Sequence, residues 1–105
     1  MYIILWQFKI KEEYIDNFIS AYGPNGTWAE LFRKDQDYKG TRLLHDVENK
    51  LIFVTIDVWE SKESFVKFKK KYEEEYHKLD REFEKFTTAE KLISEFDNGG
   101  NKILL

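Results

Sequence analysis

The sequence predicts an α+β fold in which a four-stranded antiparallel sheet carries helices on one face. Runs rich in β-branched and aromatic residues predict strands over residues 2–10, 41–47, 51–59 and 89–96. Apolar residues at helical spacing predict helices over residues 12–22 and from residue 62 to about residue 79. The resulting order, βαββαβ, is the ferredoxin-like split βαβ pattern.

The first helix ends at a sharp break, because residues 23–26 read Gly-Pro-Asn-Gly. Thr27 and Glu30 then have the spacing of a capping box, which predicts a short second helix over residues 27–33 with Thr27 as its N-cap. Ser61 is a favourable N-cap for the long helix that follows the third strand. A further short helical segment is predicted over residues 80–86, and residues 48–50 form a hairpin turn.

The chain has 105 residues, close to the size of one domain. We assign residues 1–97 to that domain and residues 98–105 to a C-terminal tail. The predicted strands over residues 2–10 and 51–59 are apolar on both faces, but the helices cover only one face of the sheet. We therefore predict a homodimer in which the open sheet faces of two subunits pack together.

Composition excludes several classes of protein. The net charge of −3 argues against a nucleic-acid partner, and the absence of cysteine excludes disulfides and cysteine-ligated metals. The N-terminal segment lacks the features of a signal peptide, and no apolar run approaches the roughly 20 residues of a spanning helix. We expect a cytoplasmic protein with no membrane partner.

Aromatic residues make up 17% of the chain, with nine Phe, six Tyr and three Trp. This is more than a small core requires, so a pocket for a small aromatic ligand is expected. Six residues are the candidates to line it, with core packing as the alternative for each: Trp6, Tyr22, Trp28, Phe68, Tyr72 and Tyr76. Trp28, on the inserted short helix, would form a lid or a wall of such a cleft.

Three residues are candidates for catalysis. Asp57 lies inside the most hydrophobic strand, where desolvation would raise its pKa and make it a base toward a phenol or quinol. The alternative, usual for buried charges, is an ion pair with Arg42 or across the dimer. His45 could face the cleft or the interface, and His77 lies near a helix end, but a lone histidine more often has a structural role. With only two histidines, no metal site is expected.

Residues 56–61 (Ile-Asp-Val-Trp-Glu-Ser) open a helix that contains Phe65 and Phe68. This run resembles the antibiotic biosynthesis monooxygenase family of dimeric α+β barrels. The turn over residues 38–41 and the aromatic stretch over residues 22–28 fit the same pattern, in the manner of an uncharacterised branch. The resemblance implies a homodimer with one cleft per subunit between the helices and the sheet. Characterised relatives include cofactor-independent oxygenases of quinol-like aromatics and haem-degrading oxygenases.

The haem-degrading branch has an Asn on the first strand, and a Trp and an axial His on the second long helix. The corresponding positions here hold Gln7, Phe68 and Lys78, with His77 next to the last. Haem binding through His77 is therefore a minor alternative, and no cofactor is expected.

Two functions of different classes follow. The first is a monooxygenase that acts on a small aromatic ligand without metal or flavin. The second is a non-catalytic ligand-binding or structural homodimer, which the lack of a specific catalytic constellation supports.

Overall fold

Four antiparallel strands form one sheet in the order β2-β3-β1-β4, in a computed structural model that describes residues 1–99. The strands are β1 (Tyr2–Ile10), β2 (Tyr38–His45), β3 (Ile52–Trp59) and β4 (Thr87–Asp97). This strand order is that of the ferredoxin-like split βαβ fold, so the predicted fold class is confirmed. Of the predicted tail over residues 98–105, only Asn98 and Gly99 belong to the described residues.

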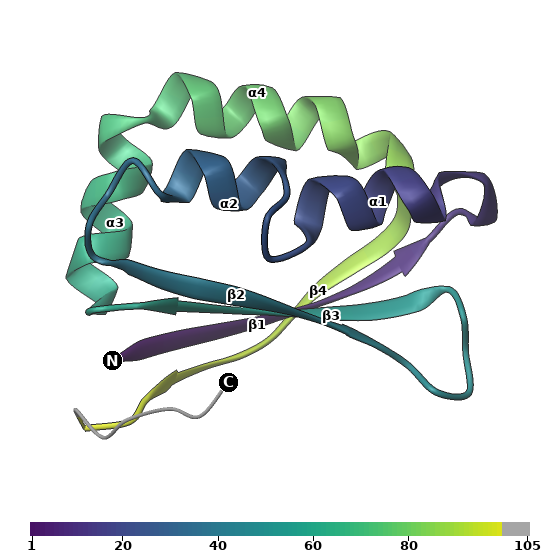
Figure 1. The fold of residues 1–105 in the computed structure, drawn as a ribbon, viewed down its shortest axis with the longest axis horizontal. Coiled ribbons are helices and arrows are strands. Elements are labelled where there is room, and N and C mark those ends of the chain that lie inside the picture. Colours follow the sequence, from purple (N-terminus) through teal and green to yellow (C-terminus); the bar gives the residue numbers. More distant parts are fainter. Residues whose placement is uncertain (100–105) are drawn as a thin grey trace.

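The helices all lie on one side of the sheet (Figure 1). They are η1 (Glu12–Tyr14), α1 (Ile15–Tyr22), α2 (Thr27–Phe32), α3 (Lys62–Lys71), α4 (Glu73–Phe83) and η2 (Glu84–Phe86). None of the helices within residues 1–99 is long and apolar enough to cross a bilayer.

The prediction of one unbroken helix to about residue 79 is wrong. Tyr72 leaves the helical conformation, with φ −109° and ψ 33°, and separates α3 from α4. The charges explain why two helices are favoured. Residues 69–71 are lysines in the last turn of α3, and residues 73–75 are glutamates in the first turn of α4. Each group has the sign that stabilises its own helix end. The separate segment predicted over residues 80–86 is the end of α4 followed by η2.

The two predicted N-caps have different outcomes. Ser61 caps α3, because its Oγ accepts a hydrogen bond from the Ser64 backbone N–H at 3.0 Å. The capping box at Thr27 is wrong: Gly26 is the N-cap of α2, and no side chain caps this helix. The Glu30 N–H instead donates to the Gly26 carbonyl at 3.0 Å. Gly26 also packs closely on α1, where a Cβ atom would lie 2.5 Å from the carbonyl oxygen of Ser20.

Substitution of Gly26 by alanine is therefore expected to destabilise the fold by about 2 kcal/mol, because the added methyl group must displace the backbone of α1. Thr27→Ala is the matched control. Since the exposed Thr27 side chain forms no cap, its loss should cost less than about 0.5 kcal/mol. Urea unfolding of both variants measures these changes. A larger cost for Thr27→Ala than for Gly26→Ala would contradict this account of the helix start.

The core lies between the helices and the inner face of the sheet and is largely aromatic. Trp59 is 0% exposed and packs against the rings of Phe32, Tyr38, Phe65 and Phe68, with centroids 5.0–5.5 Å apart. The even-numbered residues of β1 face this core. Much of the aromatic excess in the sequence is therefore used in packing.

The opposite face of the sheet has no helix on it within residues 1–99 (Figure 1). Alternation along the strands and the pairing register place eight large apolar side chains there: Ile3, Leu5, Leu44, Ile52, Val54, Ile56, Val58 and Phe96. We call this set the open face. Leu44 and Phe96 are 49% and 50% exposed. An apolar sheet face of this kind is normally covered in the working state of a protein.

Candidate functional site

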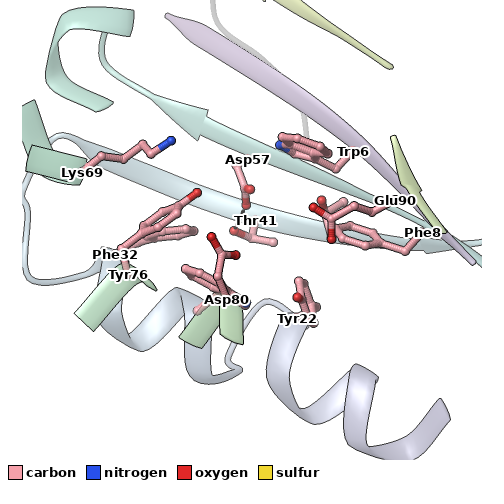
Figure 2. Close-up of a pocket in the computed structure, with 12 residues that line it drawn as sticks. Trp6, Phe8, Tyr22, Phe32, Thr41, Asp57, Lys69, Tyr76, Asp80 and Glu90 are labelled. Carbon is pink, nitrogen blue, oxygen red and sulfur yellow. Dashed lines mark hydrogen bonds between the residues drawn. The ribbon is translucent and has the colours of Figure 1, made fainter. Parts of the chain in front are cut away.

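A cavity of about 190 Å³ lies between the helices and the inner face of the sheet (Figure 2). Its floor consists of polar groups on the sheet, namely Thr41 from β2 and Thr55 and Asp57 from β3. An apolar cavity of roughly 150 Å³ accommodates benzene, so this volume suits one aromatic ring.

The walls of the cavity are aromatic and come from four elements. They are Trp6 and Phe8 of β1, Tyr22 of α1, Trp28 and Phe32 of α2, and Tyr76 of α4. Trp28 is 7% exposed and packs edge-on against Tyr76, with ring centroids 4.9 Å apart. It is thus both a wall of the cavity and part of the packing that holds α2 to α4.

Three charged side chains at the rim complete the lining: Lys69 of α3, Asp80 of α4 and Glu90 of β4. All three are exposed. Burial of part of each carboxyl group raises the pKa of Asp80 and of Glu90, and their mutual repulsion adds to the rise for Glu90.

Asp57 is held by a hydrogen-bonded chain on the floor. Because Thr41 is its cross-strand neighbour in the β2–β3 register, the Thr41 Oγ1 donates to Asp57 Oδ1 at 2.5 Å. The hydroxyl of Tyr38 lies 2.6 Å from Thr41 Oγ1. Since the single Thr41 proton goes to Asp57, Tyr38 is the donor in this second bond.

The alternative ion pair between Arg42 and Asp57 within the chain is wrong. Arg42 is paired with Ile56, so its side chain projects from the other face of the sheet. Among the described residues, no cation lies within 4.0 Å of the Asp57 carboxylate.

Desolvation raises the pKa of Asp57 to about 6, against the opposing effect of the Thr41 hydrogen bond. At neutral pH the group is mostly ionised but is more basic than an ordinary carboxylate. A pKa close to the working pH is what a general base requires.

The two tyrosines of the walls remain hydrogen-bond donors. Burial raises the pKa of both Tyr22 and Tyr76 well above the ordinary value, and nearby carboxylates raise that of Tyr76 further. Their hydroxyl groups are therefore protonated at neutral pH and can donate to an oxygen of a ligand.

Of the nine predicted site residues, the structure brings five to the cavity: Trp6, Tyr22, Trp28, Asp57 and Tyr76. The other four do not line it. Phe68 is 1% exposed in the core beside Trp59, and Tyr72 lies at the α3–α4 break.

Both histidines lie outside the cavity and are exposed. His45 stacks on Phe53, with ring centroids 4.1 Å apart, and its Nε2 bonds to the carbonyl of Lys50 at 2.8 Å. The Nε2 of His77 lies 3.8 Å from Glu73 on the same helix. These contacts are typical of a structural or surface histidine.

The residues do not fit haem. Gln7 projects from the sheet face opposite the cavity, because its neighbours Trp6 and Phe8 line it. His77 and Lys78 are exposed outside it. The lining therefore contains no imidazole that could serve as an axial ligand. Within residues 1–99, no three His, Asp or Glu side chains are grouped to hold a metal ion either.

Sequence reasoning missed the polar rim and part of the floor. Asp80 follows Tyr76 by one helical turn, a spacing that indicates a shared face. Glu90 is opposite Phe8 and Thr41 is opposite Asp57, but both relations depend on strand register. Only the helical spacing of Tyr76 and Asp80 could be recognised without knowing how the strands pair.

No protein-family model matches the sequence, and no curated protein sequence matches it at a significant level. Solved structures do match. A candidate antibiotic biosynthesis monooxygenase from Nitrosomonas europaea superposes with a TM-score of 0.69 at 13% identity, over 92% of this chain and 97% of that one. Another antibiotic biosynthesis monooxygenase structure gives 0.67 at 19% identity, again over 92% and 97%. A conserved protein from Bacteroides thetaiotaomicron, described as a possible oxidoreductase, gives 0.60 at 18% identity, over 90% and 95%.

The chain thus has the α+β fold of solved structures that are named antibiotic biosynthesis monooxygenases. At these identities the likeness establishes the fold, as the sequence resemblance predicted. It does not assign a substrate or a reaction.

Proposed function

We propose that this protein is a cofactor-independent oxygenase that binds a small phenol or quinol in the cavity and uses Asp57 as its general base. The observation that carries the proposal is a carboxylate of raised pKa on the floor of an aromatic-walled cavity of one-ring size. The names of two structural neighbours as monooxygenases agree with it. The absence of cysteine fits action in a reducing compartment such as the cytoplasm.

The roles of the residues follow from their positions. Asp57 removes a proton from the ligand, and Thr41 holds the carboxylate through its hydrogen bond. The protonated hydroxyls of Tyr22 and Tyr76 can stabilise negative charge that develops on the ligand oxygen. The aromatic walls exclude water and orient the ring.

Molecular oxygen is the oxidant, and the deprotonated ligand supplies the electrons. For a one-ring phenol, the hydroxyl carbon and a neighbouring ring carbon become the two carbonyl groups of a quinone. One oxygen atom of O₂ enters the new carbonyl group, and the other leaves as water with the hydrogens of the phenol O–H and of that ring C–H. The ring loses four electrons and O₂ gains four, so no external reductant is needed.

Oxygen uptake with one-ring phenols and quinols tests this proposal. The protein should raise the rate of oxygen consumption above the spontaneous rate, and the rise should require Asp57. If the purified protein leaves the spontaneous rates of all these compounds unchanged, the oxygenase is excluded. The non-catalytic ligand-binding homodimer is then the function to retain.

We also propose that the open face binds the open face of a second copy. Its eight side chains are apolar, and a two-fold contact between identical faces is the commonest way to cover such a surface. Because the cavity lies on the other side of the sheet, one site per subunit would remain in the dimer.

Replacing both Leu44 and Phe96 with lysine is expected to convert the dimer to a monomer, because four charges would then be buried in one two-fold interface. Sedimentation equilibrium measures the mass of each form. Val66→Lys is the matched control, since Val66 is equally exposed, at 53%, but lies on α3. A wild-type protein that sediments as a monomer, or a Leu44/Phe96 variant that remains a dimer, would contradict the assignment.

A further inference from the structure

We infer that the ligand of this cavity is a phenol that carries a positively charged amine, with the ring between the aromatic walls and the ammonium group at the Asp80–Glu90 rim. This inference rests on the proposed ligand-binding function of the cavity, and it names the class of ligand that the cavity selects.

The charges around the cavity are unbalanced. Three carboxylates line it, on Asp57, Asp80 and Glu90, against the single ammonium of Lys69, and there is no arginine or histidine in the lining. Figure 2 shows the carboxylates of Asp57 and Asp80 directed toward the middle of the cavity from opposite sides. Among the described residues, none of the three forms an ion pair within 4.0 Å. This arrangement of charges favours a cationic ligand.

Lys69 does not neutralise these carboxylates. Its Nζ lies 4.9 Å from the ring centroid of Tyr76 and 5.5 Å from that of Phe65, so it rests on aromatic faces. It acts on Asp80 only at longer range, by lowering its pKa. The same arrangement shows that a ring of this cavity wall holds an ammonium group, which is what a cationic ligand requires.

The walls also carry hydrogen-bonding groups that a polar ligand can engage. Trp28 is more than nine-tenths buried, and its Nε1 has no hydrogen-bond partner of good geometry. Burial raises the pKa of Tyr22, and the Trp28 N–H is close enough to the Tyr22 hydroxyl to oppose that rise. The two groups nevertheless do not form a well-aligned hydrogen bond. A ligand hydroxyl at this wall would accept a hydrogen bond from the Tyr22 hydroxyl, which could in turn accept one from the Trp28 N–H.

Other ligand classes leave groups of the cavity unsatisfied. An anion such as a carboxylate would meet net negative charge at the floor and at the rim. A neutral phenol would bind Asp57 but would make no charge interaction with Asp80 and Glu90. A divalent metal is not favoured, because no three carboxylate or imidazole side chains among residues 1–99 are grouped to hold one.

A matched series of three phenols tests the inference by isothermal titration calorimetry at neutral pH and low salt. The probes are tyramine, para-ethylphenol and para-hydroxyphenylpropionate, which share a ring and differ in the charge of the side chain. Tyramine is expected to bind about fivefold to tenfold more tightly than para-ethylphenol, in keeping with about 1 kcal/mol for an exposed charge interaction. The anion is expected to bind most weakly.

The double variant Asp80→Asn and Glu90→Gln should reduce the affinity for tyramine to that for para-ethylphenol. The readout is the ratio of the two affinities within the variant, so it does not require an unchanged affinity for para-ethylphenol. Measurable binding of para-ethylphenol also shows that the variant is folded. Glu74→Gln is the control, because it removes one exposed negative charge from α4 outside the cavity. It should keep the full preference for tyramine.

Equal binding of tyramine and para-ethylphenol to the wild-type protein would overturn the inference and leave the phenol-binding function standing. A preference for tyramine that persists in the double variant would also overturn it. Failure of all three probes to bind would overturn both the inference and the proposed function.

Discussion

Replacement of Asp57 by asparagine is expected to lower phenol-dependent oxygen uptake by about 100-fold or more, the usual contribution of a general base. Asparagine has nearly the same shape and can still accept the hydrogen bond from Thr41, so the cavity should be preserved. What is lost is the ability to take a proton. Glu74→Gln, which removes an exposed charge elsewhere, should leave the rate unchanged.

The same substitution lowers activity but is not expected to lower folding stability. The pKa of Asp57 is raised to about 6 in the folded protein from its ordinary value of 3.8. Between these two pH values the folded state binds a proton that the unfolded state does not. The contribution of Asp57 to folding stability therefore falls as the pH rises through this window, and it is lowest above about pH 6. Because asparagine has no such penalty, the variant should be at least as stable as the wild type at neutral pH, by urea unfolding.

The pH profile gives an independent measurement of the same group. The rate should rise with pH through about 6, as Asp57 loses its proton. Thr41→Val removes a hydrogen bond that lowers the pKa of Asp57, so the midpoint should move to higher pH, whereas Thr41→Ser should restore it. If Thr41→Val leaves the midpoint of the pH profile unchanged, or if the Asp57→Asn variant has full activity, Asp57 is not the base.

The substitution Trp59→Ala is expected to reduce the free energy of unfolding by about 3–5 kcal/mol, the cost of emptying a fully buried aromatic site. A domain of this size is commonly stable by only about 5–15 kcal/mol, so a substantial part of its stability would be lost. The reason is the position of Trp59 at the end of β3, where it contacts rings of α2, β2 and α3.

Trp59→Phe should cost less than half as much. It keeps a ring in contact with its neighbours and removes the Trp59 Nε1, which is buried without a hydrogen-bond partner. Urea unfolding followed by far-ultraviolet circular dichroism compares the two variants, because fluorescence would change with the loss of a tryptophan. Equal costs for the two would mean that Trp59 Nε1 has a partner, and that its hydrogen bond matters as much as the ring.

The strands could be predicted closely because their side chains alternate and their ends are polar or glycine-rich. The observed β1 has the predicted bounds, and β3 begins one residue later than predicted. The bounds of the other two were less accurate: β2 begins three residues earlier and ends two residues earlier, and β4 begins two residues earlier and ends one residue later. The α3–α4 break escaped prediction for a physical reason. Phe68, Tyr72 and Tyr76 keep helical spacing across it, so the apolar pattern continues while the backbone does not. The change from lysine to glutamate was the signal that could have located it.

The site was harder to predict than the fold. Asp57 stood out in the sequence because a carboxylate is unusual in such an apolar strand. Phe68, Tyr72 and Tyr76 share one helical spacing, so the sequence could not tell cavity residues from core residues among them. The break at Tyr72 places Tyr76 at the cavity while Phe68 remains in the core. Glu90 and Thr41 were not predicted at all, since only the register of two strand pairs brings them to the cavity.

The central place of β1 in the sheet affects the order in which the chain can fold during synthesis. One edge of β1 pairs with β3 and the other with β4, in a register that joins Tyr2 to Asp97. A growing chain can form the β1–β3 pair early, but the second edge of β1 has no partner until β4 has left the ribosome. Contacts so far apart in sequence slow folding, and an unpaired apolar edge is a site of aggregation. Truncation within β4 should therefore yield an aggregating chain, although the cavity floor on β2 and β3 would be intact in sequence.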